Sequence, residues 1–168
     1  MTPEELRALQ APLKDQYRED PTSALVTLRA EGALDDVNVS CRVETGRALV
    51  EAGLHPASGG SGLQACSGDM LLEALVACFG VTVRAVATAL GIPARGTVRA
   101  EGDLDFRGTL GLSKDVPVGF REIRLTLELA TEVAADQMAT LLKLSERYCV
   151  VLQTLRAPPV VAVRQASR

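Results

Sequence analysis

Apolar and polar residues alternate in several segments of the chain, which is the pattern of β-strands with one buried face. Three of these segments precede residue 54, and two longer ones follow residue 96. Turn residues separate the early segments, so the sequence predicts an antiparallel meander, followed later by a hairpin with a long connection. A last strand is predicted near the C-terminus. The predicted strands are residues 23–30, 37–44, 47–53, 97–108, 118–130 and 160–164.

Other segments have the periodicity of helices. The segment TPEE at residues 2–5 combines a capping box with proline at the first helical position, so a helix is predicted to run to about Tyr17. Residues 132–147 have the pattern of a second amphipathic helix. Residues 149–155 are predicted to form a further short helical turn.

The longest predicted helix lies in the middle of the chain, from about Gly68 to Leu90. Ser67 is its predicted N-cap, and Gly91 ends it, with Pro93 just beyond. Its apolar residues nearly encircle it, so we expect it to be buried on most sides. A sheet on one flank alone would leave half of that surface in water.

The order of these elements is strands, helix, strands, helix, strand, which is typical of an α+β fold with helices packed on one face of an antiparallel sheet. Residues 1–20 are interpreted as an N-terminal helical extension, and residues 21–168 as a single domain. Residues 55–69 are rich in glycine and serine and are predicted to form a loop before the central helix.

The composition narrows the class of protein. The chain has 168 residues, of which 47% are hydrophobic and 23% charged, with a net charge of −3 and no cluster of basic residues, so nucleic-acid binding is not expected. The N-terminus lacks a secretory signal, and the charge-free run from Ala74 to Val83 is far shorter than the ~20 residues that span a bilayer. We therefore expect a cytoplasmic protein with no membrane partner.

The four cysteines include no CxxC pair, and there is a single histidine, so neither a zinc site nor a metal cofactor is expected. Cys78, in the apolar middle of the central helix, is either a small core residue or a nucleophile. Cys41 and Cys66 are interpreted as a core and a loop residue. His55 has no Ser/Asp constellation around it, so a His-dependent hydrolase is not favoured.

Two stretches carry a family resemblance. GGSGLQACSGDMLLEALVACF, at residues 59–79, and ERYCVVLQTL, at residues 146–155, resemble the OsmC/Ohr family of thiol-dependent peroxide reductases. The resemblance covers residues 23–165, in order and at similar spacing. It implies an intertwined homodimer in which antiparallel sheets surround long central helices, and it would explain why this central helix is apolar almost all round.

The resemblance also implies a reaction and its residues. Cys78 would be oxidised by an apolar organic or lipid hydroperoxide to a sulfenic acid, and Cys149 would condense with it to a disulfide. An external dithiol, such as a lipoyl group, would restore the pair. No cofactor is implied. The alternative interpretation is a non-catalytic protein of this fold that binds an apolar ligand at its dimer interface in a stress response.

A thiolate in an apolar site needs a nearby cation, because burial opposes ionisation of the thiol. In the family this is an arginine from a strand before the loop, held by a carboxylate at the start of the cysteine helix. Arg47 and Asp69 are the residues of this chain assigned to those roles. Arg42 is a second candidate cation and His55 a third, whereas Arg84 is predicted to point about 120° away from Cys78.

Overall fold

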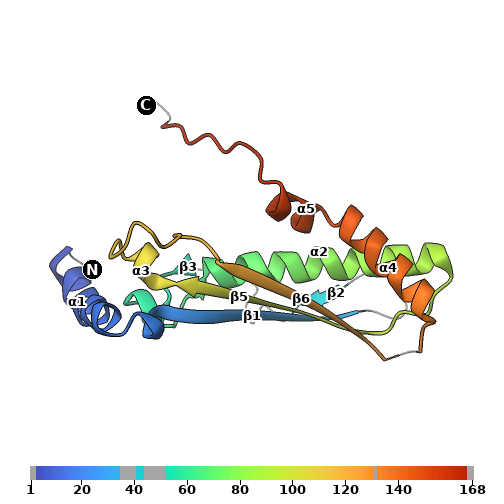
Figure 1. Cartoon of the computed structure of the whole chain (residues 1–168), viewed down its shortest axis with the longest axis horizontal. Coiled ribbons are helices and arrows are strands. Elements are labelled where there is room, and N and C mark those ends of the chain that lie inside the picture. Colours follow the sequence, from blue (N-terminus) through green and yellow to red (C-terminus); the bar gives the residue numbers. More distant parts are fainter. Residues whose placement is uncertain (1–2, 35–40, 44–51, 131, 166–168) are drawn as a thin grey trace.

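A four-stranded sheet with helices packed on one of its faces forms the body of the protein (Figure 1). The computed structural model describes residues 3–34, 41–43, 52–130 and 132–165. The long helix α2, Ser67–Leu90, lies along the sheet (Figure 1). Two C-terminal helices, α4 at Ala135–Tyr148 and α5 at Val150–Arg156, lie on the same side. This confirms the predicted α+β class and the placement of the helices on one face.

The strand order of the sheet is β2-β1-β5-β6, and every neighbouring pair is antiparallel. β5 is central, and Ala100 in it is opposite Ala30 on one side and Leu125 on the other. The predicted hairpin with a long connection is confirmed, and its connection contains the short helix α3, Phe106–Thr109. The strands are β1 Leu25–Leu34, β2 Cys41–Val43, β5 Gly96–Asp105 and β6 Glu122–Leu129.

Two predicted strands differ from the structure. Residues 47–51 of the strand predicted at 47–53, and residues 37–40 and 44 of the one predicted at 37–44, lie outside the described residues. The described end of the first, β3 at Ala52–Gly53, pairs in parallel with β4, Ala65–Cys66, and not with the antiparallel sheet. Residues 160–164 form no strand, and this part of the chain leads away from the body of the molecule (Figure 1). Its valine side chains are almost fully exposed, at 99% for Val160 and 94% for Val163. This segment therefore has no partner strand among the described residues of the chain.

Helix α2 runs from Ser67 to Leu90 and is followed by Gly91 at a φ of 66°. Only glycine adopts this left-handed conformation readily, and the N–H of Ile92 donates to the carbonyl of Ala87, which closes the last turn. The predicted end of the helix is confirmed. The predicted cap is wrong, because Ser67 is the first helical residue and Cys66 occupies the N-cap without a side-chain hydrogen bond.

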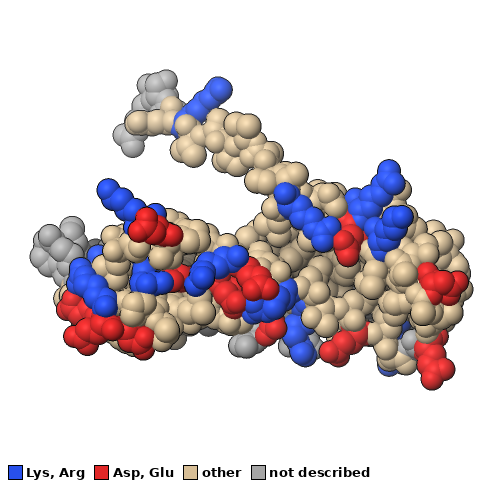
Figure 2. Space-filling model, in the orientation of Figure 1, with Lys and Arg blue, Asp and Glu red and all other residues tan. Residues whose placement is uncertain are grey.

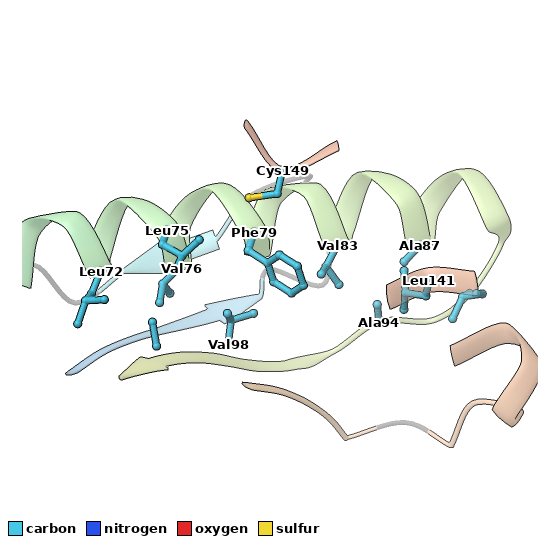
Figure 3. Packing of buried hydrophobic residues seen from close by; sticks show 12 residues of the cluster. Leu72, Leu75, Val76, Phe79, Val83, Ala87, Ala94, Val98, Leu141 and Cys149 are labelled. Atoms are coloured by element: carbon cyan, nitrogen blue, oxygen red, sulfur yellow. The ribbon is translucent and has the colours of Figure 1, made fainter. Parts of the chain in front are cut away.

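The main core lies between α2 and the sheet (Figure 3). Leu72, Leu75, Val76 and Val83 of α2 are fully buried there, as is Val98 of β5. Helix α2 is long and apolar enough to span a membrane. The core helix of a folded domain can have the same length and composition. The buried residues named above show that α2 is such a core helix. The core also takes in Phe79 and Ala87 of α2, Ile92, Ala94 and Ala100 before and within β5, and Leu141 and Cys149 from the C-terminal helices.

The N-terminal extension forms helix α1, Pro3–Glu19, two residues longer than predicted, and it is anchored to the domain. The buried Tyr17 hydroxyl donates a 2.7 Å hydrogen bond to the carbonyl of Ala57, and the Gln10 amide donates to the carbonyl of Ser58. Tyr17 also packs with Phe106 in a second, smaller core. The extension therefore holds the loop that precedes α2.

The face of the sheet away from the helices carries polar side chains. Asp103 of β5 accepts hydrogen bonds from Thr27 of β1 and from two nitrogens of Arg124 of β6, at 2.6 to 2.9 Å. Acidic and basic side chains are intermixed in the view of Figure 2. An antiparallel sheet with one apolar and one polar face needs no second layer on the polar side.

Candidate active site

Cys78 lies in the middle of α2, twelve residues before the helix ends. Its side chain is half-buried and packs against the main core. Its backbone carbonyl accepts a 2.7 Å hydrogen bond from the Thr82 hydroxyl, one turn later. A thiol on a long, well-packed helix has a fixed position, as a reacting group requires.

Cys149 is the junction between two helices, α4 Ala135–Tyr148 and α5 Val150–Arg156. Its N–H donates to the carbonyl of Ser145 at 3.0 Å, and its carbonyl accepts from the N–H of Gln153 at 2.9 Å. Its side chain is fully buried, and the sulfur points toward α2 (Figure 3). Both predicted C-terminal helices are confirmed, and they place this thiol against the central helix.

The structure brings Cys78 and Cys149 together, although they are 71 residues apart in the sequence. Both are free thiols, and their side chains lie close enough to interact. Burial, and after it the neighbouring Cys78 sulfur, raise the pKa of Cys149 to about 11. Cys149 therefore keeps its proton at neutral pH.

Asp69 lies in the first turn of α2, nine residues before Cys78. Nine residues of helix rise about 13.5 Å, so its carboxylate does not contact the thiol pair. Its titratable neighbours are His55 and Glu73. Burial raises the pKa of Asp69, and the nearby His55 partly opposes that rise.

His55 is held by the start of the loop before α2. Its Nδ1 accepts a 3.0 Å hydrogen bond from the N–H of Ala57, and its ring stacks on Phe106 with 4.9 Å between centroids. Burial lowers the pKa of His55, and Asp69 raises it by less, so the imidazole is uncharged at neutral pH. An uncharged ring at this place is a poor stabiliser of a thiolate. The path of the loop before α2 brings His55 close to Phe106 and Asp69. The only sign of this arrangement in the sequence is the pair His55–Pro56, which begins a short helical turn.

Only one of the three candidate arginines has a described side chain. Arg47 lies outside the described residues, and the side chain of Arg42 does too, although its backbone is in β2. Arg84 is buried, and its Nη1 donates to the carbonyl of Ala94 at 3.0 Å, while its Nε has no partner. Among the described residues, no hydrogen bond or ion pair joins a cation to Cys78, and no cluster of three metal-ligating side chains occurs.

An apolar groove of about 850 Å³ lies beside the thiol pair. Leu75 and Phe79, which flank Cys78 on α2, form one wall, and Leu152, one turn after Cys149, forms another. The remaining apolar wall comes from α2, β6, α4, α5 and the segments that adjoin β6 and α5. These wall residues are Leu71, Gly119, Phe120, Ile123, Leu125, Leu127, Leu142, Leu155 and Pro158.

A sequence profile described as OsmC-like protein matches residues 60–164, which include α2 and both cysteines of the pair. The chain belongs to the OsmC-like family. Its fold is similar to that of an OsmC-like hydroperoxide resistance protein from Jannaschia sp. CCS1, with a TM-score of 0.59 and 16% identity, over 86% of this chain and 95% of that one. No curated protein matches this OsmC-like chain in sequence.

Proposed function

We propose that the protein is a thiol-dependent peroxidase that reduces organic or lipid hydroperoxides through Cys78 and Cys149. The observation that carries the proposal is the proximity of these two free thiols, one half-buried and one fully buried, beside an apolar groove. Membership of the OsmC-like family and the similarity to a hydroperoxide resistance protein support a peroxidase role.

The proposed reaction has two steps in the protein. The Cys78 thiolate attacks one peroxide oxygen, the O–O bond breaks, and the released alkoxide takes up a proton to become the alcohol. Cys78 is then a sulfenic acid. Cys149 attacks its sulfur, the S–S bond forms, and hydroxide leaves with a proton as water. An external dithiol reduces this disulfide by exchange and is itself oxidised.

The two thiols differ in a way that fits these roles. Cys149, with its raised pKa, stays protonated in the resting protein, so its S–H group stabilises negative charge on Cys78. Cys149 is therefore suited to react second, once Cys78 carries the sulfenic acid. Arg47 remains the proposed cation, with Asp69 acting on the site only indirectly, from the start of α2.

A homodimer is part of the proposal. Met70, Val81 and Leu90 on α2 are 37 to 41% exposed, and the valines of the C-terminal segment are more exposed still. Apolar surface of this extent marks an interface with another chain. A second copy of the chain would cover it, and light scattering should give the mass of a dimer at micromolar concentration.

The test of catalysis is consumption of cumene hydroperoxide with dithiothreitol or dihydrolipoamide as the reductant. Cys78→Ser should abolish turnover, whereas the control Cys66→Ser should retain it. After one equivalent of peroxide, with thiols blocked at low pH, peptide mapping should recover Cys78 linked to Cys149. Recovery of Cys78 as a free thiol would contradict the proposal.

The second candidate is a non-catalytic protein that binds an apolar ligand, and the size and apolar lining of the groove favour it. The same assay separates the two functions. A protein that binds an apolar probe without consuming peroxide supports this second candidate.

A further inference from the structure

The N-terminal helix α1 docks on one short helical turn in the loop that precedes α2. Two side-chain hydrogen bonds from α1 end on backbone carbonyls of this turn. Tyr17 donates to Ala57 at 2.7 Å, and Gln10 donates to Ser58 at 3.2 Å. A Cβ on the next residue, Gly59, would lie 3.3 Å from the side chain of Gln10, so the helix packs closely there. This turn is therefore the platform on which α1 rests.

His55 determines the shape of the turn. Its Nδ1 accepts the N–H of Ala57 at 3.0 Å, and its backbone carbonyl accepts the N–H of Ser58 at 2.8 Å. The Ser58 hydroxyl, which is buried, donates to the same carbonyl at 2.9 Å. Since Nδ1 is an acceptor, the uncharged ring carries its proton on Nε2. A second proton at Nδ1 would face the N–H of Ala57 and break that hydrogen bond.

The side of the imidazole that faces α2 is acidic. Asp69 interacts with His55, and Glu73 lies beside Asp69 on the next turn. Burial lowers the pKa of His55 more than Asp69 raises it, so this pKa lies below its ordinary value of 6.5. The folded protein thus binds the proton less tightly than the unfolded chain does. The stability that the uncharged ring gives to the turn is complete above pH 6.5 and is lost as the pH falls through the folded-state pKa.

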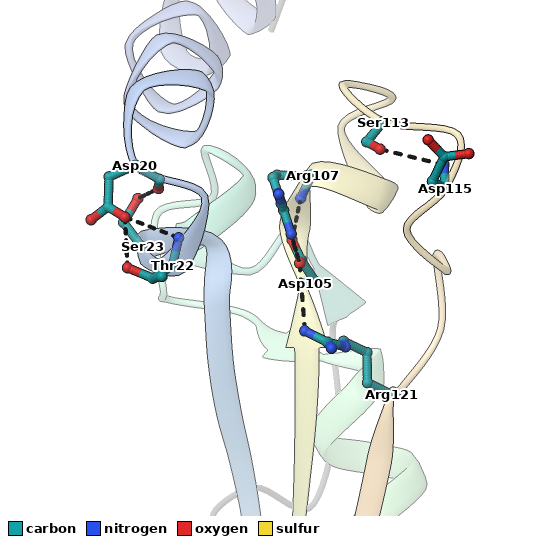
Figure 4. A network of polar contacts seen from close by, with 8 residues as sticks. All are labelled: Asp20, Thr22, Ser23, Asp105, Arg107, Ser113, Asp115 and Arg121. Carbon is teal, nitrogen blue, oxygen red and sulfur yellow. Dashed lines mark hydrogen bonds and ion pairs between the residues drawn. The ribbon is translucent and has the colours of Figure 1, made fainter.

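The groups on the other sides of the imidazole keep their charge near neutral pH. On the side of α3 the ring stacks on Phe106, which follows the buried Asp105. Arg107 at 2.6 Å and Arg121 at 3.9 Å share this carboxylate (Figure 4), and Arg107 holds its pKa below the ordinary value. On the side of α1 the titratable group is Tyr17, whose pKa is raised by burial above its ordinary value of 10.0.

We propose that His55 is a pH-sensitive latch for the N-terminal helix: a proton taken up from solvent at Nδ1 breaks the bond to Ala57, loosens the turn and releases α1 from the domain. Release would uncover Phe106, against which Tyr17 packs in the second core. Histidine is the side chain whose ordinary pKa lies nearest to neutral pH. The latch lies in the extension and the loop, so it works whether or not the thiol pair reduces peroxides.

Amide hydrogen exchange of the full-length protein between about pH 5 and pH 8, divided by the intrinsic exchange rate at each pH, measures the opening of α1. We expect this opening to increase as the pH falls below 6.5, by up to about tenfold per pH unit, the limit for one proton. Amides of β5 should not follow. The chain has a single histidine, so its proton NMR signal reports the pKa of His55 directly. The NMR midpoint should lie below 6.5, at the pH where the increase in opening levels off.

Three variants assign the effect to its residues. His55→Asn offers an oxygen to the N–H of Ala57 but does not titrate, so the opening of α1 should no longer depend on pH. Asp69→Asn removes the carboxylate that favours the charged ring, so the NMR midpoint should move to lower pH. The matched control Asp136→Asn, which changes the acid in the first turn of α4, should leave the opening and the midpoint as they are.

Two measurements on the wild-type protein decide the matter even if a variant does not fold. Opening of α1 that is independent of pH, or an NMR midpoint at or above 6.5, would overturn the latch. Equal pH dependence in His55→Asn and in the wild-type protein would assign the effect to another group and would also overturn it. No peroxide is present in these measurements, so failure of the latch and failure of the proposed reaction are distinguishable.

Discussion

The Cys149 thiol, at the start of α5, lies next to Cys78 in the middle of α2. The two residues come from helices that pack against each other and share one core. A disulfide requires Cα atoms within about 7 Å, so the packing of α4 and α5 on α2 is the condition for oxidation of this pair.

The raised pKa of Cys149 makes stability depend on pH in the alkaline range. The pKa is 9.0 for an ordinary thiol and about 11 in the folded protein, so the folded state holds this proton more tightly than the unfolded state. The contribution to stability is complete below pH 9 and is lost as the pH rises toward 11. We expect urea unfolding to show a decline on the order of 2 kcal/mol over this range. The decline should be absent in Cys149→Ala and present in the control Cys66→Ala.

Alkylation should distinguish the two thiols of the pair. Cys149 is fully buried and protonated at neutral pH, whereas Cys78 is only half-buried. Because the thiolate is the reactive form, iodoacetamide should modify Cys78 first at pH 7. Mass spectrometry of the digested protein over time measures this order. Earlier modification of Cys149 would mean that the roles of the two cysteines are reversed.

Asp103 should make stability depend on pH in the acid range. Hydrogen bonds from Arg124, and next from Thr27, lower the pKa of Asp103 to about 2 from an ordinary value of 3.8. The stabilisation is complete above pH 4 and is lost as the pH falls through 2. Asp103→Asn should lower the free energy of unfolding by on the order of 1 kcal/mol at pH 6, because solvent screens this partly exposed pair, with little effect at pH 2. Asp115→Asn, in an exposed loop, is the control and should change neither value.

Leu72 and Leu71 are adjacent on α2 but differ in burial. Leu72 is fully buried in the main core, while Leu71 is 37% exposed and lines the groove. Leu72→Ala should destabilise the protein by about 2–5 kcal/mol, because it removes buried methyl groups and leaves a cavity. Leu71→Ala should cost much less. Denaturant midpoints of the two variants make the comparison, and equal losses would show that Leu71 is also covered, as in a dimer.

The sequence predicts those parts of the fold that local chemistry determines. The end of α2 follows from Gly91, and β5 and β6 follow from long alternating runs. The two-residue strands β3 and β4 could not be predicted, because their pairing depends on the path of the loop between them. The valines near Val160 have the pattern of a strand, but a pattern does not show which chain supplies the partner strand.

The thiol pair could be predicted only by resemblance to a family. Nothing in the spacing of Cys78 and Cys149 indicates proximity, since packing of α4 and α5 on α2 brings them together.

Helix α5 has no buried residue of its own, and Cys149 joins it to the core. In the reduced protein noncovalent contacts alone hold this end of the chain, so it should open locally more readily than α2 and the sheet. A disulfide to Cys78 would close a long loop and should stabilise the folded chain by several kcal/mol. Melting temperature and amide exchange would then report the oxidation state directly. The C-terminal segment that follows α5 would be loosely held in the reduced protein and tethered to α2 in the disulfide form.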